Sequence, residues 1–189
     1  MTKKQLRKIY REKRLELSLK DKTKLDDLLL IQFQKLHLTA FHSLFCYWPI
    51  AGFNEPDTHL FSDFLFFKNP GLITAYPKIN NDNGTMEAIV TDEATGFEPN
   101  AFGVMEPKGS LALSPEEIDV VLVPLLCFDK AGYRVGYGKG YYDRYLSRCR
   151  QGCLKIGLSY FDPVDEVADK HEFDVPLDLC VTPHATYVF

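Results

Sequence analysis

The sequence predicts an α/β fold built around a mostly parallel sheet. The run IDVVLVPLL at residues 118–126 is apolar without alternation, which is typical of a strand buried on both faces. A second apolar run, KIGLSY at 155–160, follows a helix-forming segment at 141–150. Strand and helix patterns alternate along the rest of the chain, as they do in layered α/β domains. We therefore expect a three-layer, Rossmann-like sheet with helices on both faces.

The length and charge of the chain limit its domain number and its partners. A chain of 189 residues suits one domain, which we expect to span residues 1–189. The net charge of −4 argues against a broad nucleic-acid-binding surface. The basic N-terminus lacks the apolar core of a signal peptide, and no apolar run is long enough to cross a bilayer. We expect a cytoplasmic protein, monomeric or weakly dimeric, without nucleic-acid or membrane partners.

Two helices are expected near the N-terminus. Residues 3–17 place leucine, isoleucine and tyrosine among many Lys and Arg, as in a basic amphipathic helix. Ser18, with Asp21 three positions later, is a looser form of the capping box that starts a helix. The second helix is expected to run to about Leu38.

Strand and helix signals alternate in the middle of the chain. Strands are expected at 43–48, 72–77 and 85–90, with a turn at 80–84 between the last two. The segment 58–69 is predicted to be a helix with Asp57 as its N-cap. The stretch 91–110 is rich in Gly, Pro, Asn and Glu, and we expect a long surface loop with little regular structure.

The C-terminal half follows the same alternation. SPEE at 114–117 is a helix-start signature, and its turn must be short because the buried strand at 118–126 follows. Residues 127–140 are expected to form the loop that leaves this strand, before the helix at 141–150. After the strand at 155–160, a polar loop and a last short strand are expected to close the chain.

The cysteines show neither a metal-binding nor a disulfide pattern. Their number is odd, and no CxxC pair occurs. We expect reduced and mostly buried thiols at Cys46, Cys127, Cys149, Cys153 and Cys180.

The stretch RVGYGKGYYDRY at 134–145, the glycine loop, carries the clearest functional signal. Its glycines, Gly136, Gly138 and Gly140, occupy alternate positions. A P-loop requires Ser or Thr after Gly-Lys, whereas here Gly140 follows Lys139. The dinucleotide-binding motif requires G-x-G-x-x-G after a first strand, whereas this G-x-G-x-G lies late in the chain. The glycine loop is therefore neither of these phosphate motifs.

The position and composition of the glycine loop still favour anion binding. Its glycines allow backbone N–H groups to approach a ligand closely, and a helix start follows directly. Arg134 and Lys139 add positive charge, and Asp143 is placed to hold a magnesium ion that bridges phosphates. Tyr141 and Tyr142 can stack on a flat heterocycle or pack in the core. The alternative interpretation is a flexible turn before a helix.

The residues around the glycine loop resemble a known enzyme family. LVPLLCFDKAGYRVGYGKGYYDRYL at 122–146 is similar to the signature region of the 5-formyltetrahydrofolate cyclo-ligases, also called 5,10-methenyltetrahydrofolate synthetases. KKQLR, NEPDTH, AFGVMEP, KIGLSY and HEFDVPLDLCVTP follow the order of the family's motifs and cover most of the chain. The resemblance implies the same α/β fold.

The resemblance also implies an ATP-dependent ring closure. The formyl oxygen of 5-formyltetrahydrofolate attacks the γ-phosphate of ATP, N10 closes onto the activated carbon, and phosphate leaves. The products are 5,10-methenyltetrahydrofolate, ADP and phosphate, and Mg²⁺ accompanies ATP. This chemistry requires alignment and charge neutralisation rather than a side-chain nucleophile. Two alternatives stay open: another small-molecule phosphoryl-transfer enzyme, and a folate- or nucleotide-binding protein without turnover.

Individual residues receive roles through the same resemblance. The residues implied to bind ATP are Lys3, Arg7, Arg134, Gly136, Tyr137, Gly138, Lys139, Gly140, Tyr141 and Tyr142. Those implied to act in catalysis are Lys139, Arg134 and Tyr141. Those implied to contact folate are Glu55, Asp57, Trp48, Tyr76 and Tyr141. The implied magnesium ligands are Asp143 and Asp178. The acidic pair suits a pterin, because a carboxylate can accept two of the N–H donors that this ring presents in a row.

Several of these residues also have a simpler structural interpretation. Lys3 and Arg7 suit a solvated basic face of a helix. Asp57 suits a helix N-cap, and both of its roles can hold together. Asp178 suits a strand-end carboxylate, and the aromatic residues Trp48 and Tyr76 suit the core.

Overall fold

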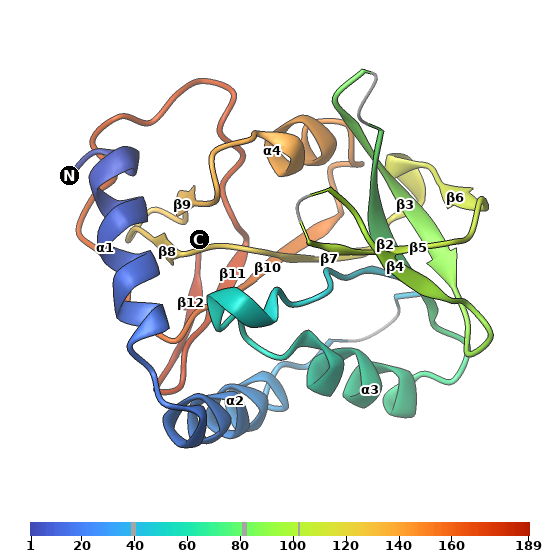
Figure 1. The fold of residues 1–189 in the computed structure, drawn as a ribbon, viewed down its shortest axis with the longest axis horizontal. Helices are drawn as coiled ribbons and strands as arrows, with labels where there is room; N and C mark the ends of the chain where they lie inside the picture. The colour runs from blue at the N-terminus through green and yellow to red at the C-terminus, as the bar shows by residue number, and fades with distance from the viewer. Residues whose placement is uncertain (39–40, 81–82, 102) are drawn as a thin grey trace.

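One large sheet organises the computed structural model, which describes residues 1–38, 41–80, 83–101 and 103–189. Within these ranges the sheet has eight strands in the order β12-β11-β10-β7-β1-β2-β3-β6 (Figure 1). The parallel strands are β11 (Leu179–Val181), β10 (Leu154–Leu158), β7 (Val120–Val123), β1 (Ser43–Phe45) and β2 (Ile73–Asn80). The antiparallel strands at the edges are β12 (Thr186–Val188), β3 (Thr85–Thr91) and β6 (Ala112–Leu113). The prediction of a mostly parallel sheet is confirmed.

Helices cover both faces of this sheet, as predicted. In Figure 1, α2 (Leu19–Phe33) and α3 (Thr58–Lys68) lie on one face, and α4 (Tyr141–Leu146) lies on the other. None of the helices in the described ranges is both long and apolar enough to cross a membrane.

The central strands are buried on both faces, which explains their unbroken apolar sequence. Leu44 of β1 packs in the core beneath α2 and α3, whereas its neighbour Phe45 packs on Tyr145 of α4 with ring centroids 4.8 Å apart. In β7, Val121 and Leu122 likewise face opposite cores. Because successive side chains point to opposite faces, a strand covered on both sides has no polar positions to alternate with.

The helix starts follow the local capping signals. Ser18 Oγ accepts from the Asp21 amide at 3.1 Å, so the predicted start of α2 is confirmed. Asp57 Oδ1 accepts from the His59 amide at 3.2 Å, which confirms Asp57 as the N-cap of α3. SPEE forms a single 3₁₀ turn with a capping box, as the short distance to β7 requires. The end of α2 is predicted too late, because the helix stops at Phe33 and tightens into a turn.

The predicted irregular loop at 91–110 is wrong in part. It contains a hairpin of β4 (Phe97–Pro99) and β5 (Met105–Pro107), which pair antiparallel. Strands of three residues are too short to produce an alternating pattern, so their pairing depends on the partner strand. The turn expected at 80–84 and part of this loop fall on residues 81, 82 and 102, which lie outside the described residues.

α1 (Lys3–Leu15) lies beside the sheet rather than on one of its faces (Figure 1). Leu6 and Tyr10 pack against a hairpin of β8 (Cys127–Phe128) and β9 (Arg134–Val135). This hairpin corrects the prediction of a plain loop after β7, since two-residue strands leave no pattern in a sequence. The packing brings the basic N-terminal helix next to the glycine loop.

The cysteine side chains are all free, as predicted. Cys46, Cys127, Cys153 and Cys180 are buried, and Cys149 is partly buried. The expectation of reduced and mostly buried thiols is confirmed.

We expect Gly157→Ala to destabilise the fold. A Cβ at Gly157 would lie 2.6 Å from Leu125 Cδ2 and 2.7 Å from Leu177 Cδ1, inside the core. Overpacking of this kind costs about 1–3 kcal/mol. Gly52→Ala is the matched control, because a Cβ there meets no atom within 4 Å. Denaturant titration should show a lower free energy of unfolding for Gly157→Ala than for the control, and equal values would contradict this packing around β10.

Candidate active site

A cavity of about 620 Å³ lies beyond the carboxyl ends of β1 and β7. The residues predicted from the sequence that line it are Lys3, Arg7, Trp48, Glu55, Arg134, Gly136, Tyr137, Gly138, Lys139, Gly140, Tyr141, Tyr142 and Asp143. They come from α1, from the segment after β1, and from the glycine loop. Segments that are far apart in the sequence therefore meet around one space.

Three of the predicted site residues do not line this cavity. Asp57 caps α3. Tyr76 lies behind Trp48, with ring centroids 6.1 Å apart. Asp178 accepts from the Lys155 amide at 2.7 Å and pairs with Lys155 Nζ at 2.8 Å, at the start of β11. The structure therefore does not bring Asp178 to Asp143, and the described residues include no cluster of three or more His, Cys, Asp or Glu suited to a metal.

The glycine loop runs from β9 through a turn into α4, and α1 holds this turn. Arg7 Nε donates to the Gly136 carbonyl at 2.9 Å. Gly138 has φ +89°, a conformation that strains other residues, and a Cβ there would lie 3.0 Å from Arg7 Cζ. Gly140 has φ +70° and precedes the first turn of α4. The glycines therefore allow the turn and the close approach of an arginine.

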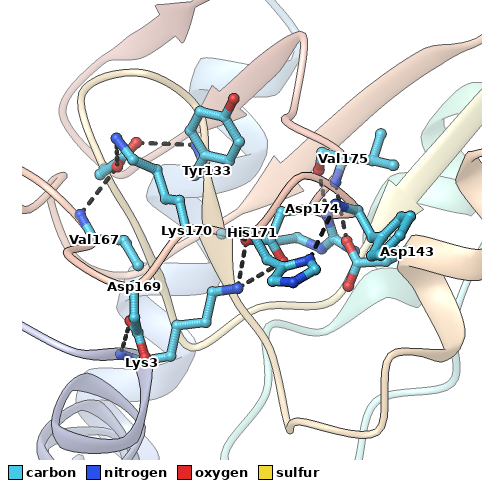
Figure 2. Close-up of polar contacts among 12 residues, drawn as sticks. Lys3, Tyr133, Asp143, Val167, Asp169, Lys170, His171, Asp174 and Val175 are labelled. Carbon is cyan, nitrogen blue, oxygen red and sulfur yellow. Dashed lines mark hydrogen bonds and ion pairs between the residues drawn. The ribbon is translucent and has the colours of Figure 1, made fainter.

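Arg134 and Asp143 form an ion pair in the wall of the cavity. Arg134 Nη2 lies 2.9 Å from Asp143 Oδ1, and Arg134 Nη1 donates to the Val175 carbonyl at 2.5 Å. The Val175 amide also donates to Asp143 Oδ1 at 3.1 Å (Figure 2). Both side chains are thus oriented by the C-terminal segment.

Asp174 is a cavity residue that the sequence prediction missed. Lys3 Nζ donates to Asp174 Oδ1 at 2.6 Å, and the His171 amide donates to Oδ2 at 2.7 Å (Figure 2). Partial burial acts to raise the pKa of Asp174, but the hydrogen bonds from Lys3 and His171 outweigh it and hold that pKa below its ordinary value. In HEFDVPLD nothing distinguishes Asp174 from Asp178, because the path of a loop decides which of them reaches the cavity.

Glu55 is a buried carboxylate in the wall of the cavity. Its Oε2 accepts from the Ile50 amide at 2.6 Å, and its Oε1 accepts from the Tyr137 hydroxyl. Burial raises the pKa of Glu55, while the nearby Arg14 guanidinium opposes that rise. Each carboxylate oxygen has a further lone pair, so Glu55 can accept two more hydrogen bonds from a ligand.

Aromatic rings shape the rest of the cavity. Tyr142 stacks on Phe45 with an interplanar angle of 19°, and Trp48 contacts Phe97 with ring centroids 4.5 Å apart. The Tyr142 hydroxyl is buried and has no hydrogen-bond partner among the described residues. Burial raises the pKa of Tyr142, so this hydroxyl stays protonated. These aromatic side chains give the cavity flat, largely apolar walls.

Comparisons with known proteins find relatives that match nearly the whole chain. A sequence model of the 5-formyltetrahydrofolate cyclo-ligase family matches residues 1–183. A 5-formyltetrahydrofolate cyclo-ligase of Mycoplasma pneumoniae is 37% identical over 194 residues, covering 96% of this chain and 98% of that protein. The NMR structure of Aquifex aeolicus 5,10-methenyltetrahydrofolate synthetase matches with a TM-score of 0.78 and 31% identity, over 100% of this chain and 93% of that chain.

A second solved structure extends the match. It is a 5,10-methenyltetrahydrofolate synthetase from Mycoplasma pneumoniae, with a TM-score of 0.74 and 31% identity over 96% of this chain and 98% of that chain. Sequence and fold thus agree over nearly the whole length, and the chain belongs to the 5-formyltetrahydrofolate cyclo-ligase family.

Proposed function

We propose that this protein catalyses the ATP-dependent cyclisation of 5-formyltetrahydrofolate to 5,10-methenyltetrahydrofolate, with release of ADP and phosphate. Membership of the cyclo-ligase family supports the reaction. The observation that carries the proposal is one cavity that joins a cationic glycine loop to a buried carboxylate. We propose that residues 1–189 act as one cyclo-ligase domain.

The triphosphate of ATP is proposed to bind between α1 and the glycine loop. Lys3, Arg7, Arg134 and Lys139 line this side of the cavity and supply its positive charge. Positive groups that are fixed before the reaction stabilise charge that moves onto the phosphate oxygens, because they need no reorganisation at that moment. Arg7 and Arg134 are fixed in this sense, since both donate to backbone carbonyls.

The pterin ring is proposed to bind at the opposite side, against Glu55. The 2-amino group and the neighbouring ring N–H can both donate to this carboxylate, which lines the cavity. Trp48, Tyr141 and Tyr142 then lie along the ring. Asp57 caps α3 and is not proposed to contact the pterin.

The reaction needs the two substrates to meet in one enclosed space. The formyl oxygen attacks the γ-phosphorus and the bond to the bridging oxygen of ADP breaks, which gives a phosphorylated formyl group. N10 then forms a bond to the formyl carbon and loses its proton to solvent. The C–O bond breaks, and phosphate leaves with its electron pair. Alignment of the reacting atoms supplies the rate enhancement, and Lys139, Arg134 and Tyr141 are the proposed groups near the transferred phosphoryl.

The carboxylates of Asp143 and Asp174 fit a magnesium ion that accompanies ATP. Both line the cavity, and Mg²⁺ commonly takes one or two carboxylates while water and phosphate oxygens complete its shell. A bound ion would neutralise phosphate charge. Lys3 pairs with Asp174, and Arg134 pairs with Asp143. When the carboxylates bind the ion, both cations can bind phosphate oxygens instead.

Direct assay tests the proposed function. Purified protein mixed with 5-formyltetrahydrofolate and Mg-ATP should produce the near-ultraviolet absorbance of the methenyl product only when ATP is present. A stable phosphorylated product without that absorbance would indicate another phosphoryl-transfer enzyme. Binding of both ligands without any product would indicate a folate- or nucleotide-binding protein.

A further inference from the structure

Arg14 is a buried cation of α1 that the reaction described so far does not use, with only 2% of its surface exposed. We propose that Arg14 is a positioning residue for the folate site: it fixes the Tyr137 hydroxyl and, through it, holds the Glu55 carboxylate ready to accept from the pterin. This inference rests on the proposed function, because it assigns the pterin to Glu55.

The guanidinium of Arg14 is held at each of its nitrogens. Arg14 Nε donates to the Phe53 carbonyl at 2.6 Å, and Nη1 donates to the Leu125 carbonyl at 3.0 Å. Nη2 donates to the Tyr137 hydroxyl, which in turn donates to Glu55 Oε1. One side chain therefore joins α1, the end of β7, the glycine loop and the segment that carries Glu55.

This arrangement fixes the direction of the Tyr137 hydroxyl. A guanidinium can only donate, so the Tyr137 oxygen must accept from Arg14. The single proton of that hydroxyl is then available for Glu55 alone, and Glu55 Oε1 must act as an acceptor. A lysine has no planar fork and cannot reach three acceptors in this way.

The charge of Arg14 also bears on the ionisation of Glu55. The groups that face this carboxylate are Arg14 from α1, Tyr137 from the glycine loop, Tyr47 after β1 and Tyr142 from α4. Arg14 is the positive one among them, with Nη2 4.0 Å from Glu55 Oε1. Burial raises the pKa of Glu55 and Arg14 opposes the rise, so loss of the arginine charge moves that pKa further up.

The sign of the pH effect follows from what the pterin needs. Two N–H donors require an ionised carboxylate, so folate binding is present above the pKa of Glu55 and is lost as pH falls through it. A variant with a higher Glu55 pKa therefore loses folate affinity at a higher pH than the wild type does. A residue that only braced the fold would not shift this pH dependence.

The test compares Arg14→Gln, Arg14→Lys and the wild type for 5-formyltetrahydrofolate, by KM at saturating Mg-ATP and by Kd from calorimetry, across pH. Arg14→Gln should raise both constants about tenfold or more near neutral pH, the effect of one hydrogen bond to a charged group. The defect should shrink as pH rises, while KM for ATP stays close to the wild-type value. Arg14→Lys keeps the charge, so its pH midpoint should stay close to that of the wild type.

Arg150→Gln is the matched control, because it removes an arginine from an exposed ion pair with Asp119 and should leave the pH profile unchanged. A loss in Arg14→Gln that is the same at every pH, or equal for folate and ATP, would overturn the proposal. If that variant does not fold, Tyr137→Phe removes the same relay. It should raise the folate Kd and move the midpoint to higher pH, and unchanged values would overturn the proposal.

The wild type separates this inference from the proposed function. Calorimetry needs no turnover, so the folate Kd of each variant can be compared with the wild type even if no methenyl product forms. Absence of product in the wild type would contradict the proposed function alone. A normal wild-type reaction with an unshifted Arg14→Gln profile would contradict the inference alone.

Discussion

Replacing Glu55 by glutamine is expected to raise the KM for 5-formyltetrahydrofolate by about 100-fold or more. The change removes the charge that two pterin donors meet in a buried wall, and hydrogen bonds to charged groups contribute about 1.5–3 kcal/mol each. KM for ATP should change little, because the cations proposed to bind its triphosphate come from α1, β9 and the glycine loop and none of them pairs with Glu55. Initial rates at varied concentrations of each substrate measure both constants.

Asp57→Asn is the matched control for this result. Asn caps helices about as well as Asp, so the variant keeps α3 and removes only the charge. Its folate KM should stay close to that of the wild type. An equal rise in both variants would return Asp57 to the pterin site, and an unchanged KM in Glu55→Gln would remove the carboxylate from the proposed folate contact.

Replacing Asp143 by asparagine is expected to lower kcat by about 100-fold or more, the size seen when one preorganised charge-stabilising group is removed from an active site. The variant loses the charge that orients Arg134 and a proposed ligand of the metal that accompanies ATP. Turnover should need more Mg²⁺, whereas the KM for folate should change less than kcat. Rates over a magnesium titration measure this difference.

Asp178→Asn tests whether Asp178, the second magnesium ligand implied by the family resemblance, binds the ion as Asp143 is proposed to do. Asp178 pairs with Lys155 rather than facing the cavity, so its variant should keep the magnesium dependence of the wild type. Asp174→Asn, by contrast, should resemble Asp143→Asn. Loss of magnesium dependence in Asp178→Asn together with normal behaviour of Asp174→Asn would favour the assignment made from sequence.

The parts of the fold that the sequence predicts well are those set by nearby residues. Ser18 and Asp57 bond to amides three and two positions away, so each helix start is written locally. The parallel sheet is predictable because a strand covered on both faces must be apolar throughout. The hairpin of β4 and β5 is not predictable in this way, since its three-residue strands depend on each other across a loop.

The site residues likewise fall into those set by the local sequence and those set by contacts between distant segments. The glycine loop and its charges are contiguous in the sequence, and the family resemblance of NEPDTH points to Glu55, so both are candidates before the fold is known. The path of the C-terminal segment decides that Asp174 rather than Asp178 reaches the cavity. Arg14 meets Leu125 and Tyr137 across 111 and 123 positions, and such contacts exist only once α1 has packed beside the sheet. Helix caps, buried strands and the glycine loop can therefore be predicted from the sequence, because each is set by neighbouring residues. Which charged side chains reach the cavity is decided by packing between distant segments.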